Sequence, residues 1–172
     1  MSVKSIILLT LISLAGAAIP SPAKGPTLKQ TLEWLQVKTG KWYRETKNFS
    51  LKEYAILTQS WENLENGKVV YNIYANKALK IQYTFYLYDL DEKTVNVIPH
   101  NRNYYDVEVK TEEEKELIKI SIQGSTDDYP WVNVLCFRIN SRENAERHAN
   151  ALKHAIILSK IARNFKTQEE IF

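Results

Sequence analysis

Residues 79–88 alternate strictly between apolar and polar side chains, which restricts this part of the chain to an extended strand. Successive side chains of a strand point to opposite faces, so one face of this segment is strongly apolar. Its members are Leu79, Ile81, Tyr83, Phe85 and Leu87. Six other segments have a similar but shorter alternation: 52–62, 69–75, 94–98, 105–110, 118–122 and 132–139. The pattern therefore predicts about seven strands.

Two short connections predict how these strands are joined. Asn66-Gly67 is the favoured two-residue hairpin turn, because both residue types tolerate positive φ. Asp89–Lys93 is predicted to form a second tight turn. Strands joined so closely must be antiparallel neighbours. The expected arrangement is a meander rolled into a β-sandwich or a small barrel.

Helical patterns flank the strands. Thr27 and Gln30 form a capping-box pair, and leucines then recur at helical spacing, which predicts a first helix over residues 28–38. Asn140 and Glu143 form another capping pair ahead of a long C-terminal helix. An apolar stripe of that helix is expected to close the open end of the sandwich, which makes the fold class α+β. The stripe consists of Ala145, Ala149, Leu152, Ile156 and Ser159.

The N-terminus is typical of a cleavable export signal. A positive region ending at Lys4 precedes an apolar run over residues 6–18 and the small residues Ala17 and Ala18, near which cleavage is expected. The run is shorter than the roughly 20 apolar residues that a spanning helix needs. The protein is therefore expected to be secreted or periplasmic, without membrane insertion after cleavage. The expected organisation is a signal peptide (1–18), a flexible linker (19–26), a single domain (27–164) and a C-terminal tail (165–172).

Composition limits the partners and the sources of stability. The chain has 23 basic and 20 acidic residues, and the loss of Lys4 with the signal leaves a net charge of about +2. So small an excess predicts no nucleic-acid partner. The single cysteine, Cys136, excludes an intramolecular disulfide, so that stability must come from packing. Four Trp, ten Tyr and five Phe supply large apolar faces for it.

Seven antiparallel strands followed by one closing helix resemble the pleckstrin-homology (PH) superfold. The chain is similar to PH-like domains of uncharacterised bacterial exported proteins in three stretches: Thr31–Leu35, Tyr83–Asp91, and Glu143–Arg147 with Ala151–Ala155. The resemblance implies a fold and no particular activity. Intracellular PH domains bind phosphoinositides through basic residues around the first hairpin. The corresponding segment here, Glu62–Lys68, is mostly acidic or neutral, so headgroup binding is not expected.

A weaker resemblance is to the lipocalins, secreted β-barrels that carry small apolar ligands. Gly40–Tyr43 resembles their Gly-x-Trp opening motif, and Thr126–Tyr129 resembles their Thr-Asp-Tyr segment. A lipocalin needs two further strands after the second motif. Only about ten residues separate Tyr129 from Asn140. For this reason the lipocalin resemblance is the weaker one, and a lipocalin-like carrier of a small apolar ligand is the alternative function.

Candidate reactive residues do not form a recognisable catalytic or metal-binding pattern. Cys136 could serve as the nucleophile of a hydrolase only beside a histidine, and it lies in a predicted strand, where a half-buried structural thiol is expected. His148 and His154 are six residues apart on one helix and point to different faces, and His100 is distant in sequence. No catalytic residue, cofactor or metal is expected.

The remaining polar segments are interpreted structurally. Asp127 and Asp128 precede a Tyr-Pro pair and are expected to form a turn, because no calcium-binding loop surrounds them. Glu112–Glu116 is expected to form a solvated turn. Asn48 begins a glycosylation sequon, which has meaning only in a eukaryotic source.

Aromatic residues in predicted loops are the best candidates for contact with a partner. Exposed aromatic clusters are typical of binding surfaces. The sequence therefore predicts an exported, non-enzymatic binding or interaction domain. It does not identify the partner, for which a protein is the candidate. The candidate contact residues are Tyr104, Tyr105, Tyr129 and Trp131.

Overall fold

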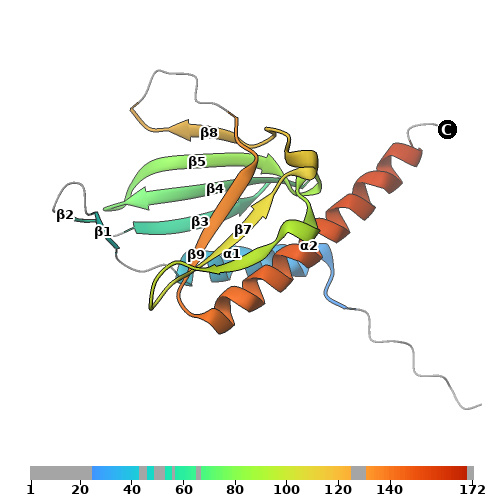
Figure 1. The fold of residues 1–172 in the computed structure, drawn as a ribbon. Coiled ribbons are helices and arrows are strands. Elements are labelled where there is room, and N and C mark those ends of the chain that lie inside the picture. Colours follow the sequence, from blue (N-terminus) through green and yellow to red (C-terminus); the bar gives the residue numbers. More distant parts are fainter. Residues whose placement is uncertain are drawn as a thin grey trace, which may run out of the picture.

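The computed structural model describes residues 25–42, 46–48, 53–55, 57–64, 67–124 and 131–169. The expected signal peptide, Asp127, Asp128 and Tyr129 lie outside these residues. The described part is an α+β structure with two helices and two antiparallel sheets (Figure 1). A separate short pair, β1 (Thr46–Asn48) and β2 (Glu53–Ala55), precedes the sheets.

The seven expected strands are confirmed as the strands of the two sheets. The four-stranded sheet has the order β3-β4-β5-β8 and the three-stranded sheet the order β6-β7-β9. Their bounds are β3 Leu57–Asn63, β4 Lys68–Ala75, β5 Ala78–Tyr86, β6 Asn96–Pro99, β7 Tyr105–Lys110, β8 Lys119–Ile122 and β9 Val134–Ile139. The expected strand over 52–62 is divided between β2 and β3.

The strand order departs from the expected meander after β5. Strands β3, β4 and β5 are sequential neighbours, and Gly67 adopts a positive φ of 73° ahead of β4. The two-residue length predicted for this turn is wrong, because the Leu64 amide donates to the Lys68 carbonyl oxygen at 2.8 Å and the connection therefore spans residues 65–67. The tight turn predicted at Asp89–Lys93 is wrong, because β5 does not pair with β6. The chain instead forms two 3₁₀ helices, η2 (Leu87–Asp89) and η3 (Glu92–Thr94).

Buried leucines explain this crossing. Leu87 and Leu90 are fully buried and anchor the connection in the core, so the chain passes from one sheet to the other. Strand β8 then returns to pair with β5, and β9 pairs with β7. In the described part of the chain the two sheets do not close into a barrel.

Both helices begin at capping residues. The Thr27 amide donates to Gln30 Oε1 (2.9 Å) and the Gln30 amide donates to Thr27 Oγ1 (3.3 Å), which confirms the capping box of α1 (Leu28–Trp42). For α2 (Arg142–Glu169) the predicted cap is wrong by one residue, because the Asn144 amide donates to Ser141 Oγ (3.3 Å).

Helix α2 also continues through the expected tail at residues 165–169. The C-terminal end of this 28-residue helix extends past the two sheets (Figure 1). Neither described helix combines the length and apolarity needed to cross a bilayer.

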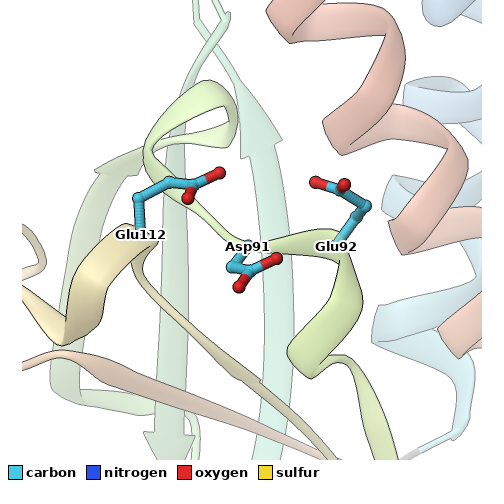
Figure 2. Close-up of side chains that lie close together, drawn as sticks. All are labelled: Asp91, Glu92 and Glu112. Carbon is cyan, nitrogen blue, oxygen red and sulfur yellow. The ribbon is translucent and has the colours of Figure 1, made fainter.

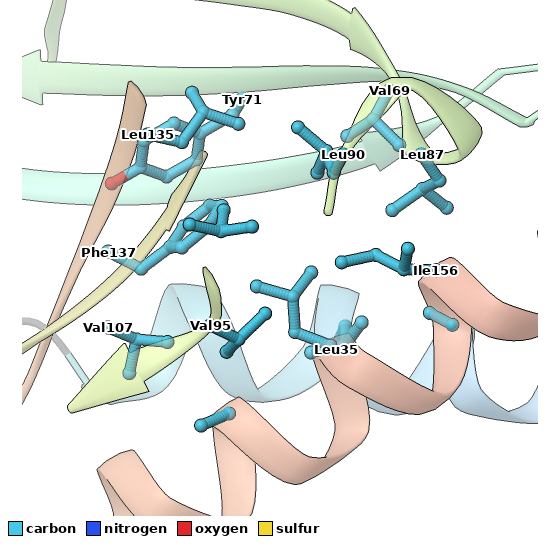
Figure 3. Packing of buried hydrophobic residues seen from close by; sticks show 14 of the residues in the cluster. Leu35, Val69, Tyr71, Leu87, Leu90, Val95, Val107, Leu135, Phe137 and Ile156 are labelled. Carbon is cyan, nitrogen blue, oxygen red and sulfur yellow. The ribbon is translucent and has the colours of Figure 1, made fainter. Parts of the chain in front are cut away.

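The core lies between the sheets and the two helices (Figure 3). All members of the predicted α2 stripe are buried, as expected. Phe137 is a central ring: its centroid lies 4.7 Å from that of Tyr71, 5.5 Å from that of Trp61 and 5.3 Å from that of His148. By contrast, the predicted apolar row of β5 is fully buried only at its C-terminal end, at Phe85 and the following Leu87.

Candidate functional site

An apolar groove lies between α1 and α2. The two helices pack against each other, and most of the exposed lining of the groove is apolar. Trp34 of α1 and the small Ala151 of α2 both line it. The groove has a volume of about 580 Å³, within the range of ligand-binding pockets. We call it the helical groove, and its lining residues are Pro26, Gln30, Thr31, Trp34, Arg147, Asn150, Ala151 and His154.

An apolar strip on α2 continues the line of the helical groove. Ile157 and Ile161 are 43% and 46% exposed, respectively. They follow His154 by three and seven residues, so all three lie along one face of the helix. A surface helix usually presents polar residues on the side that faces away from the core. The strip, defined as Ile157 and Ile161, is therefore an exposed apolar surface of the kind that marks interaction sites.

A hydrogen bond fixes one edge of the groove. Nε2 of His154 donates to the backbone carbonyl oxygen of Pro26 at 2.8 Å. The bond holds the segment that precedes α1 against α2. Among the groove-lining residues, all of which are described, Arg147 is the only Lys, Arg, Asp or Glu, and its side chain is exposed.

Two of the four predicted contact residues lie together elsewhere. Tyr104 and Tyr105 line a polar cleft of about 500 Å³ that also contains Arg102 and Arg142. Trp131 is 50% exposed but precedes β9, whereas Tyr105 pairs with Ile139 at the other end of that strand. Eight residues of extended chain span about 26 Å. The structure therefore brings the two tyrosines together and leaves Trp131 apart; Tyr129 lies outside the described residues.

Three carboxylates meet where the connections between the sheets approach α2 (Figure 2). Asp91, Glu92 and Glu112 each have an oxygen within 4.8 Å of the others. Lys160 of α2 donates to Glu92 at 2.6 Å and also to Glu112. The hydrogen bond from Lys160 lowers the pKa of Glu92. Lysine thus supplies the positive charge at this cluster, which joins α2 to η3 and to the 3₁₀ turn η4 (Glu112–Glu114).

Cys136 lies on the outer face of β9 and is more exposed than the expected half-buried thiol, although neighbouring groups still partly desolvate it. Strand alternation directs Leu135 and Phe137 into the core and Cys136 to the outer face. Partial desolvation raises the pKa of Cys136, and together with the smaller effect of the Asp106 and Glu108 carboxylates it brings the value to about 11. At neutral pH the thiol is protonated and is a poor nucleophile.

The three histidines occupy separate environments. His100 contacts Asp106, with Nδ1 3.1 Å from Oδ2. His148, expected at the border of the apolar stripe, is instead completely buried, with Nε2 3.1 Å from Thr39 Oγ1. His154 lies at the groove. Among the described residues, Cys136 has no hydrogen bond to a histidine.

We expect the native Cys136 thiol to be alkylated about 100-fold more slowly than the thiol of the urea-unfolded chain at pH 8, because a rise in pKa of two units from 9 reduces the thiolate fraction by that factor. Stopped-flow labelling with iodoacetamide would measure both rates. Glu108→Gln is expected to raise the native rate. Equal native and unfolded rates would contradict the assigned environment.

Comparisons with protein-family models, curated proteins and solved structures gave no match. The assignment of the candidate site therefore rests on the geometry of the helical groove alone.

Proposed function

We propose that this chain is an exported, non-enzymatic interaction domain with a PH-like sandwich, and that the helical groove is its binding site. The observation that carries the proposal is the continuity of the groove with the strip at Ile157 and Ile161. Together they form an apolar surface on the outer side of the helical layer. A partner that covers such a surface removes apolar area from water, which favours association.

The packing of the interior supports an interaction domain over a ligand carrier. Aromatic rings from both sheets meet at Phe137, and helix α2 fills the remaining side with Leu152 and Ile156. A carrier needs its cavity between these layers. The high pKa of Cys136 and its lack of a histidine partner favour a non-catalytic domain over a thiol hydrolase.

Site-specific photo-cross-linking tests the binding site. A p-benzoylphenylalanine at the exposed position Asn150 is expected to form a covalent adduct with the partner in the producing organism. The matched control is the same residue at Lys80, an exposed position on β5. Trp34→Ala is expected to remove the adduct at position 150 while circular dichroism remains unchanged. Failure to form an adduct at position 150, or equal adducts at both positions, would contradict the proposal.

A further inference from the structure

We infer that the partner presents an acidic amphipathic helix, which lies along α2 in the helical groove and over the strip; this inference rests on the proposed function. The relevant face of α2 runs from Arg147 through Ala151 and His154 to Ile161. These residues recur at intervals of four, three and seven, which keeps them on one side of the helix. At 1.5 Å per residue the face is about 21 Å long, which matches about four turns of a second helix.

The shape of the surface favours a helix over a compact ligand. A small molecule in the groove would cover Trp34 and Ala151 but would leave Ile157 and Ile161 in water. A helix laid along α2 covers both parts at once, with apolar side chains spaced three or four residues apart. The groove lies between two helices, so side-chain ridges of a third helix can pack into it.

Charge favours an acidic partner. Arg147 is exposed at the groove and is available for a carboxylate. Two cations on the opposite side of α2 are already paired: Lys160 binds Glu92, and Arg163 lies 3.8 Å from Asp89. A second copy of the chain would bring no Asp or Glu from its own groove lining, all of which is described. The complementary surface therefore belongs to a different chain that carries Asp or Glu beside its apolar residues.

Selection from a displayed library of random 20-residue peptides tests this inference with the purified protein as bait. We expect enriched peptides to have apolar residues at i, i+3/i+4 and i+7, to carry Glu or Asp on one flank, and to gain helical circular dichroism on binding. The Ile157→Ser/Ile161→Ser double variant should bind the selected peptides at least tenfold more weakly. Arg147→Glu should lower the affinity for the selected peptides about fivefold, and a Glu-to-Lys exchange in the peptide should restore it. Arg102→Glu, in the separate polar cleft, is the charge-matched control and should leave the affinity unchanged.

Several outcomes would overturn the inference. These are no enrichment, enrichment of basic or extended peptides, and equal binding to the double variant. Sedimentation that reveals a dimer abolished by Ile157→Ser/Ile161→Ser would assign the surface to a second copy. If adducts at Asn150 persist while helical peptides fail, the proposed binding site stands and only the helical partner is wrong. If both are absent, the groove is not the binding site.

Discussion

A Leu152→Asp variant is expected to be unfolded at room temperature. Leu152 is 0% exposed and lies on the face of α2 that packs into the core. An unpaired carboxylate there costs several kcal/mol, and the lost apolar packing adds about 2–5 kcal/mol. A domain of this size is stable by only about 5–15 kcal/mol. Circular dichroism and urea titration would measure the loss.

The matched control for this change is Lys153→Asp at the next position. Lys153 is half-buried on the neighbouring side of α2 and can keep a charged group in contact with water. Its free energy of unfolding should change by less than about 1 kcal/mol. Similar urea midpoints for the two variants would mean that the inward face of α2 has been assigned incorrectly.

Acidification is expected to destabilise the protein through His148. Burial lowers the pKa of His148 from 6.5 to about 3 in the folded state. Between these values the unfolded chain binds a proton that the folded chain does not. The contribution of His148 to the free energy of unfolding is therefore fully present above pH 6.5 and is lost as the pH falls towards 3. The shift corresponds to about 5 kcal/mol in total and to about 3 kcal/mol between pH 7 and pH 4.5.

Urea denaturation at pH 7 and pH 4.5 would measure this loss in the wild type and in His148→Gln. Glutamine does not titrate, and its amide can still hydrogen-bond to Thr39 Oγ1. The variant should lose about 3 kcal/mol less than the wild type over this range, while carboxylates such as Glu92 contribute equally to both proteins. The same pH dependence in the wild type and in His148→Gln would refute the role of His148.

Features that depend on neighbouring residues were predictable from the sequence. The Thr27–Gln30 cap, the strand segments and the buried face of α2 follow from local hydrogen bonding and from periodicity. The order in which the strands pair did not follow from these local patterns. Asp89–Lys93 has the composition of a turn, and only the burial of Leu87 and Leu90 in the assembled core makes it a crossing between sheets.

The candidate site was less predictable, because it exists only where α1 and α2 meet. Trp34 stands beside the leucine stripe of α1, and Ile157 and Ile161 stand outside the buried stripe of α2. These apolar residues lie beside or outside the stripes assigned to the core, and they were the signal for the site in the sequence. Tyr105 and Trp131 were both expected in loops, and the strand pairing that places them at opposite ends of β9 cannot be read from local sequence.

The interleaved strand order also determines how the chain can fold. Ile81 of β5 pairs with Ile122 of β8, and Val107 of β7 pairs with Phe137 of β9, so each sheet is completed across about 30 to 40 intervening residues. Closing such loops costs entropy before the contacts they bring are formed, which slows folding. Neither sheet is complete until β8 and β9 are available. Truncation before residue 134 should therefore leave a chain without a cooperative unfolding transition.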